Sequence, residues 1–335
     1  MTVGETMKLQ RLGVIGGGAW GTAMAQVIAS DGSDVLLWAR EPEVVDAIND
    51  THCNPIFLPV LPLSERIKAT DHLAAMAICD ALVVVVPAQF VRPVLAALPA
   101  AARPLVLCAK GIEAGSQMLM SEVAEAVVPG APVAVLSGPT FAHEVAAGHP
   151  TAITLACADE AVGLALAERL RRPGFRPYLS NDVVGAEIGG AVKNVLAIAC
   201  GVVDGAGLGQ NARAALISRG FAEMTRFGLA RGAKVETLAG LSGLGDLVLT
   251  CSSVSSRNFS LGKGLGQGIP AAELLSDRRT VAEGASTAPV LAEAARAVGV
   301  DMPIVDAVCA LLTGGAKVDD VVKALLARPL KQEGK

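Results

Sequence analysis

The feature that most constrains the fold is a glycine-rich segment close to the N-terminus. Gly16-Gly17-Gly18-Ala19-Trp20-Gly21 directly follows the short apolar run Leu12–Ile15 and precedes Thr22–Ser30, a stretch with helical character. A second apolar run, Val35–Trp38, completes a unit of about 30 residues. The order strand, glycine-rich turn, helix, strand predicts a βαβ unit whose turn binds a dinucleotide.

Each glycine of this pattern has its own physical role. Gly16 allows a tight turn, Gly18 lets the backbone approach a pyrophosphate, and Gly21 lets the helix pack closely on the strand. Free backbone N–H groups at the start of the helix supply donors to the same phosphates. We therefore expect an NAD(P) cofactor at this loop.

The residues after Val35–Trp38 bear on the choice of cofactor. A site dedicated to NAD usually has an acidic residue here for the ribose 2′-hydroxyl, whereas an arginine meets the 2′-phosphate of NADP. This chain has Arg40, followed by Glu41. Arg40 mildly favours NADP, and a solvated surface arginine beside Glu41 is the alternative.

The pattern of apolar and alanine-rich segments changes once along the chain, near residue 181. Before it, apolar runs alternate with alanine-rich stretches, which predicts a mostly parallel sheet with helices on both faces. Further strands are expected at 81–86, 105–108, 133–136 and 152–156. Helices are expected near 183–201, 212–229, 286–298, 304–312 and 318–326, and turns at the glycine-rich segments 205–209 and 262–268. The fold prediction is α/β, with a Rossmann-like doubly wound domain over 1–181 and an all-α substrate domain over 182–335.

Composition excludes several classes of protein. Hydrophobic residues make up 52% of the 335 residues and charged residues 18%, which suits a folded chain with two cores. A net charge of −4 provides no basic field for nucleic acid, and no run approaches the ~20 uninterrupted apolar residues of a membrane span. The polar N-terminus lacks the apolar part of a secretory signal. Seven scattered cysteines and four histidines without metal spacing predict a cytoplasmic protein without disulfides or a metal site.

One expected helix, 183–201, carries an unusual polar pair. Lys193 and Asn194 interrupt its apolar surface, and Gly189 and Gly190 lie on the same face as Lys193, one turn earlier. Two adjacent glycines in a helix cost about 1 kcal/mol each relative to alanine. Either a ligand beside the ammonium or the close approach of another segment would offset this cost.

Two other regions suit an anionic substrate. Lys110 and the segment Ser137–Thr140 each follow an expected strand, at the edge where open α/β sheets bind ligands. Ser256 can cap a helix that begins at Arg257, whose guanidinium would add donors beside free backbone N–H groups. This arrangement predicts a phosphate site; an ordinary capped surface helix is the alternative.

Taken together, the motifs resemble those of the bacterial-type NAD(P)-dependent glycerol-3-phosphate dehydrogenases over nearly the whole chain. They occur in the family's order at residues 16–23, 110–111, 137–140, 189–194, 245–247 and 256–258. The resemblance implies reversible reduction of dihydroxyacetone phosphate to sn-glycerol 3-phosphate by hydride transfer, at the start of glycerophospholipid synthesis, and a homodimer. Ala19 departs from the family, which commonly has serine there.

The resemblance also implies roles for individual residues, with Lys193 as the catalytic acid/base. The residues implied to surround the substrate are Lys110, Gly138, Thr140, Lys193, Asp246, Ser256, Arg257 and Asn258. Those implied to contact the cofactor are Gly16, Gly18, Ala19, Trp20, Gly21, Arg40, Lys110, Ala142, Arg257, Val281 and Glu283. A β-hydroxyacid or ketopantoate-type dehydrogenase is the nearest alternative, because Arg257 would also accept a carboxylate. A non-catalytic NADP-binding module is the alternative from another class.

Overall fold

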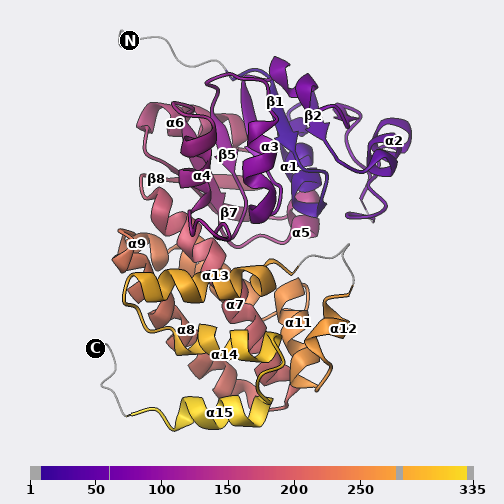
Figure 1. The fold of residues 1–335 in the computed structure, drawn as a ribbon. Coiled ribbons are helices and arrows are strands. Elements are labelled where there is room, and N and C mark those ends of the chain that lie inside the picture. The colour runs from indigo at the N-terminus through magenta and orange to yellow at the C-terminus, as the bar shows by residue number, and fades with distance from the viewer. Residues whose placement is uncertain (1–8, 60, 277–281, 330–335) are drawn as a thin grey trace. The chain divides into compact units, whose positions relative to one another are not determined.

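The structure, a computed structural model, describes residues 9–59, 61–276 and 282–329 (Figure 1). The chain divides into two units. The first contains the described residues up to Gly190 together with Gly232–Asp246, and the second contains Ala191–Arg231 and the described residues from Leu247 onward.

Short apolar runs of the first unit form an eight-stranded sheet in the order β3-β2-β1-β4-β5-β6-β7-β8. The strands are β1 (Leu12–Ile15), β2 (Val35–Trp38), β3 (Ile67–Thr70), β4 (Ala81–Val84), β5 (Leu105–Leu107), β6 (Val133–Ser137), β7 (Thr151–Cys157) and β8 (Phe175–Ser180). Neighbouring strands are parallel except β6 and β7. Because the order runs outward from β1 in both directions, the predicted doubly wound sheet is confirmed.

Helices cover both faces of this sheet. They are α1 (Ala19–Ala29), α2 (Pro42–Thr51), α3 (Val91–Ala96), α4 (Met120–Val127), α5 (Ala142–Ala146) and α6 (Glu160–Leu170), with the 3₁₀ segments η1 (Leu73–Ile78) and η2 (Ala88–Phe90). The first unit also contains the short helix α9 (Val235–Leu238) and the π-helical turn η3 (Leu241–Gly245). In β4, Ala81 and Val83 join the core formed with α1, α2, α5 and α6, whereas Leu82 and Val84 join the core formed with α3 and α4. The uninterrupted apolar sequence of β4 thus reflects burial on both sides.

The second unit has only helices among its described residues. It contains the larger part of α7 (Val183–Gly205), together with α8 (Gly209–Ala230), α11 (Arg257–Gly266), α12 (Ala271–Leu274), α13 (Glu283–Ala297), α14 (Pro303–Leu312) and α15 (Val318–Leu326). The division between the units falls within α7 and within the short helix α10 (Asp246–Thr250). The predicted all-α region after the sheet is confirmed.

The prediction of a turn at 262–268 is wrong, because α11 continues through Gly266. A Cβ on Gly262 would lie 1.9 Å from the carbonyl oxygen of Ile198 in α7, and a Cβ on Gly266 would lie 2.4 Å from that of Val202. The glycines therefore let the backbones of α7 and α11 touch. This contact offsets the low helix propensity of glycine, which alone suggested a turn.

Helix α7 is the one described helix that is long and apolar enough to cross a membrane, with 23 residues and a mean hydropathy of 1.5 in its most apolar window. However, 89% of that window is buried inside the protein. Such burial is typical of the central helix of a folded core.

Candidate active site

The glycine loop joins β1 to α1. Gly16 has φ +122°, which favours glycine, and its N–H donates to the Trp38 carbonyl at 2.9 Å. A Cβ on Gly21 would lie 1.8 Å from the Gly16 carbonyl oxygen, so only glycine fits where α1 packs on the loop. At Gly18 a Cβ would have no neighbour within 4 Å. The tight turn and close packing expected from the pattern are present, and the backbone at Gly18 borders open space.

The N-terminus of α1 suits an anion. The helix begins at Ala19, its N-cap Gly18 makes no side-chain hydrogen bond, and its first turn has no acidic residue. Backbone N–H groups at such a terminus, together with the positive end of the helix dipole, favour phosphate. Because these donors belong to the backbone, Ala19 retains them without a hydroxyl. Trp20 is half-buried and packs against the core on this face of the sheet.

Arg40 follows β2 and points into solvent. Its side chain is 74% exposed, and its Nη2 lies 3.0 Å from Oε1 of Glu41. An exposed pair of this kind contributes at most about 1 kcal/mol. The ion pair with Glu41 therefore does little to hold the guanidinium in place.

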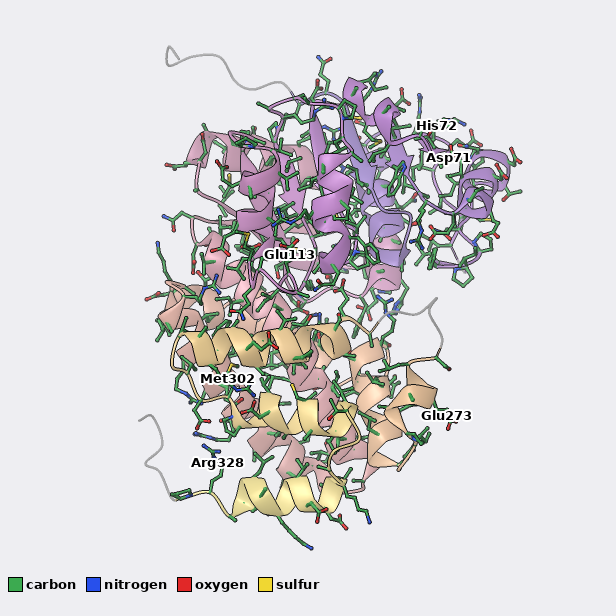
Figure 2. All side chains as sticks on the ribbon, viewed as in Figure 1. Asp71, His72, Glu113, Glu273, Met302 and Arg328 are labelled. Atoms are coloured by element: carbon green, nitrogen blue, oxygen red, sulfur yellow. The ribbon has the colours of Figure 1, made fainter. Side chains whose placement is uncertain are left out.

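Histidine and acidic side chains do not gather into a metal site within the described ranges, where no group of three or more His, Cys, Asp or Glu could hold an ion. His72 is an example: its side chain is 84% exposed and lies beside Asp71, with Nε2 3.6 Å from Oδ1 (Figure 2).

Lys110 forms a largely buried ion pair in the first unit. It follows β5, and its Nζ lies 2.8 Å from Oδ2 of Asp246 and 3.5 Å from the Gly138 carbonyl oxygen. The Asp246 side chain is fully buried and that of Lys110 is 15% exposed. Removing one member of a buried pair leaves an uncompensated charge at a cost of about 3–5 kcal/mol. The two residues are therefore fixed against each other.

Gly189 and Gly190 in α7 accommodate two different neighbours. A Cβ on Gly189 would lie 2.4 Å from the Ser242 carbonyl oxygen in η3, which identifies close backbone packing. A Cβ on Gly190 would lie 3.0 Å from Oγ of Ser137 and 3.2 Å from Cγ of Lys110. The glycine pair thus admits both another segment and the stem of a lysine.

Polar groups after β6 lie close to this lysine. The Thr140 hydroxyl donates to the Gly138 carbonyl at 3.2 Å, the same carbonyl that lies near Lys110. The Ser137 hydroxyl is buried and has no hydrogen-bond partner among the described residues. A buried hydroxyl without a partner costs about 1–3 kcal/mol, so this position suits a polar ligand atom. Ala142 begins the short helix α5.

Lys193 is a buried cation of the second unit. The residue is 6% exposed, and its Nζ donates to Oγ1 of Thr250 at 2.9 Å. Thr250, which is 4% exposed, ends α10 four residues after Asp246. An ammonium in such a place is held by fixed hydrogen bonds instead of by mobile water, which orients it.

Asn258 joins three helices of the second unit. Its Nδ2 donates to Oδ1 of Asn194 at 3.0 Å, and its Oδ1 accepts from the Gly284 N–H at 2.9 Å. These bonds connect α7, α11 and the first turn of α13. Asn258 is therefore fixed on both sides of its amide.

The start of α11 matches the predicted cap. Oγ of Ser256 accepts from the Phe259 N–H at 3.2 Å, and the helix begins at Arg257. Arg257 is exposed, with no side-chain hydrogen bond or ion pair to another described residue. Its guanidinium is thus available to an anion. Glu283 begins α13, and Val281 lies outside the described residues.

Two polar residues escaped sequence reasoning. Thr250 contacts a lysine 57 residues away, and its only sequence signal is its spacing of one helical turn from Asp246. Glu187 in α7 is 4% exposed and accepts from the Ser121 N–H at 2.8 Å and the Ser121 hydroxyl at 2.5 Å. Burial raises the pKa of Glu187 to about 7, against the opposite effect of the Ser121 bonds. Glu187 fixes the start of α7 to the first turn of α4.

Comparison with known proteins covers both units. Family models described as the N-terminus and the C-terminus of NAD-dependent glycerol-3-phosphate dehydrogenase match residues 11–163 and 182–323. A glycerol-3-phosphate dehydrogenase (NAD(P)+) of Sphingopyxis alaskensis is 65% identical and aligns with 97% of this chain and 98% of its own. The structure of glycerol-3-phosphate dehydrogenase from Coxiella burnetii is similar with a TM-score of 0.91 at 38% identity, over 95% of this chain and 99% of the other. That of the Saccharomyces cerevisiae enzyme gives 0.79 at 29% identity, over 94% and 99%. The chain therefore belongs to the NAD-dependent glycerol-3-phosphate dehydrogenase family.

Proposed function

We propose that this chain catalyses the reversible NAD(P)-dependent reduction of dihydroxyacetone phosphate to sn-glycerol 3-phosphate, with Lys193 as the acid/base. The observation that carries the proposal is the buried Lys193 ammonium, oriented by Thr250 on a largely apolar helix. Family membership supplies the substrate and the reaction type.

The glycine loop suits the cofactor pyrophosphate, because open space at Gly18 and the N–H groups of α1 occur together. When bound, the nicotinamide supplies or accepts the hydride. The cofactor contacts in this proposal are Gly16, Gly18, Ala19, Trp20, Gly21, Arg40, Lys110, Ala142, Arg257, Val281 and Glu283. Arg40 gives a mild preference for NADP, since its exposed guanidinium is free to turn from Glu41 to a 2′-phosphate.

Lys193 acts on the oxygen attached to C2 of the substrate. During reduction this oxygen gains alkoxide character, and the ammonium stabilises it and then donates a proton. During oxidation the neutral amine takes the hydroxyl proton. Thr250 holds Nζ in place, so the ammonium need not reorient as charge develops.

The substrate phosphate is held through Arg257 and the start of α11. Ser256 orders that turn, and Asn258 is fixed within it by Asn194. Binding energy from this remote group orients C2 for hydride transfer. Lys110, Gly138, Thr140 and Asp246 complete the substrate contacts.

The remaining parts of the proposal concern the cellular setting. We assign no metal to the reaction, because Lys193 can supply the proton. We place the protein in the cytoplasm, as a homodimer at the start of glycerophospholipid synthesis. None of the seven cysteines, all of which lie among the described residues, forms a disulfide, and five of them are buried, which suits a reducing compartment.

The test is the initial rate of NADPH and NADH oxidation with dihydroxyacetone phosphate, compared with ketopantoate and unphosphorylated dihydroxyacetone. Turnover confined to the phosphorylated ketone supports the proposal. Turnover with ketopantoate alone would assign the chain to carboxylate chemistry, and no turnover with any substrate would overturn the assignment.

The preference for NADP has its own test in Arg40→Ala. We expect KM for NADPH to rise about tenfold, as for loss of one contact to a charged group, while KM for NADH stays constant. Arg66→Ala is the control, since Arg66 is also an exposed arginine in an ion pair. Equal effects on the two coenzymes would rule out a role of Arg40 at the 2′-phosphate.

A further inference from the structure

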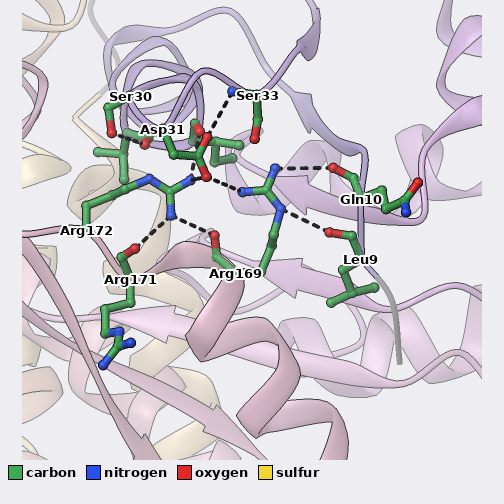
Figure 3. Close-up of polar contacts among 10 residues, drawn as sticks. Leu9, Gln10, Ser30, Asp31, Ser33, Arg169, Arg171 and Arg172 are labelled. Atoms are coloured by element: carbon green, nitrogen blue, oxygen red, sulfur yellow. Dashed lines mark hydrogen bonds and ion pairs between the residues drawn. The ribbon is translucent and has the colours of Figure 1, made fainter. Parts of the chain in front are cut away.

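Arginines cluster where α6 leads into β8 in the first unit. Arg169, Arg171, Arg172 and Arg176 lie within one short stretch of the chain. Asp31 pairs with two of them, at 3.2 Å from Nη1 of Arg169 and 2.7 Å from Nη2 of Arg172 (Figure 3). One carboxylate thus faces two guanidinium groups of the cluster.

The Arg172 side chain is mostly buried and binds backbone carbonyl groups. Its side chain is 10% exposed and donates to the carbonyl oxygens of Arg169 at 2.9 Å, Arg171 at 2.7 Å and Ile28 at 2.8 Å. Its Nε is buried without a hydrogen-bond partner among the described residues. Burial lowers the pKa of Arg172; Asp31 acts in the opposite direction, and repulsion from Arg169 adds to the lowering. Because Asp31 pairs with two of the four arginines, the cluster retains uncompensated positive charge.

The other two arginines have their charged groups available. Arg171 and Arg176 are exposed and make no side-chain hydrogen bond or ion pair with another described residue. The side chain of Arg171 points away from the Asp31 network (Figure 3). The guanidinium carbon of Arg176 lies 5.1 Å from the centre of the Tyr178 ring. A guanidinium stacked on an aromatic face still has its N–H groups directed outward, where an anion can accept hydrogen bonds from them.

The arginines at 171, 172 and 176 line an open depression of the surface, here called the arginine pocket. It has a volume of about 390 Å³ and is lined by Arg171, Arg172, Pro173, Arg176 and Pro177. Within the described part of the chain no carboxylate lines it, and none of its residues belongs to the proposed substrate or cofactor contacts. Its size falls in the range of small-molecule sites, about 300–1,000 Å³.

We propose that the arginine pocket is a second anion site, which binds a phosphate group. Guanidinium forks match phosphate oxygens two at a time, and a phosphate group, as a monoester or a diester, supplies the negative charge that this cluster lacks. The two prolines give the pocket a stiff wall, so less conformational freedom is lost on binding. A soluble phosphate monoester and a phospholipid headgroup share this chemistry.

The chain contains a single tyrosine, so fluorotyrosine gives one resonance, from position 178 beside the pocket residue Arg176. Inorganic phosphate is the first probe, with sodium chloride at matched ionic strength as the reference. The expected result is a fluorine resonance that moves with phosphate, reaches saturation and does not move with chloride. Arg171→Ala should weaken the apparent affinity about tenfold or more, as for the loss of one charge-assisted contact.

Arg66→Ala is the matched control, because it removes an exposed arginine elsewhere in the first unit. It should leave the phosphate titration unchanged. Vesicles of phosphatidylglycerol, compared with phosphatidylcholine, identify the source: broadening with phosphatidylglycerol alone, without a shift in free phosphate, assigns the pocket to lipid headgroups. No response to either probe, an equal response to chloride, or an Arg171→Ala titration like that of the parent would overturn the proposal. The readout needs no turnover, so it is independent of the dehydrogenase assay.

Discussion

Replacing Thr250 by valine should slow the reaction about 10- to 100-fold while the fold is retained. Valine matches threonine in shape, and the change removes the hydroxyl that accepts from Nζ of Lys193 at 2.9 Å. Both residues are almost fully buried, at 4% and 6% exposure, so water cannot readily replace the hydroxyl. A hydrogen bond to a charged group is worth about 1.5–3 kcal/mol, and each 1.4 kcal/mol in the barrier is about tenfold in rate.

The assay is kcat and KM for dihydroxyacetone phosphate, together with the dissociation constant of NADPH. If the hydroxyl orients the ammonium for proton transfer, kcat falls and NADPH binding does not change. Thr250→Ser is the control, because it keeps a hydroxyl at this position, and its rate should stay within about threefold of the parent. Lys193→Ala sets the upper limit of the effect, a loss of about 10² to 10⁴ in rate.

The reasoning would be refuted by a valine variant that unfolds at the parent's temperature and turns over at the parent's rate. A loss of rate shared equally by the serine variant would also refute it, because shape would then matter and the hydroxyl would not. Equal melting temperatures of all three proteins establish that the comparison concerns the site alone.

Two further predictions concern stability. Gly262→Ala places a Cβ 1.9 Å from the Ile198 carbonyl oxygen and should lower the free energy of unfolding by about 2 kcal/mol or more. Gly315→Ala is the control and should change this free energy little, because its Cβ would have its nearest neighbour at 3.5 Å. Denaturant titration of both variants gives the two free energies, and equal values would contradict the prediction. Burial raises the pKa of Glu187 from 4.5 to about 7, so the folded state binds this proton more tightly than the unfolded state. The protonated Glu187 therefore stabilises the fold below about pH 4.5, and this contribution, at most on the order of 3 kcal/mol, is lost as the pH rises to about 7. Glu187→Gln should flatten this part of the pH profile of unfolding, and an unchanged slope would show that another group is responsible.

Sequence reasoning worked best for apolar strands in the interior of the sheet. β1 and β2 were predicted to the residue, because their apolar runs end abruptly. β3 (Ile67–Thr70) and β8 (Phe175–Ser180) were missed, since each lies at an edge of the sheet. β8 contains Arg176 and Pro177 and only its first residue is buried, so little of its sequence indicates a strand.

The residues of the candidate site also differ in how well the sequence predicts them. Lys193 could be singled out from sequence because a charged residue in an apolar helix is anomalous wherever the helix lies. The partners of Lys193 and Glu187 could not, because they are 57 and 66 residues away and depend on how helices pack. The glycines of α11 were predicted to form a turn for the same reason. Their low helix propensity can be read from the local sequence, whereas the α7 backbone that they contact is distant in sequence.

The backbone contact between α7 and α11 has a consequence for mutational tolerance. Gly201 and Gly205 on one helix and Gly262 and Gly266 on the other each leave less than 2.5 Å for a Cβ before a backbone oxygen. A saturation scan should therefore find four positions, one turn apart on each helix, that accept no other amino acid although none would touch a ligand. Because these four positions carry no side chain that could be enlarged or trimmed, natural variation cannot adjust the spacing of the two helices there in small steps.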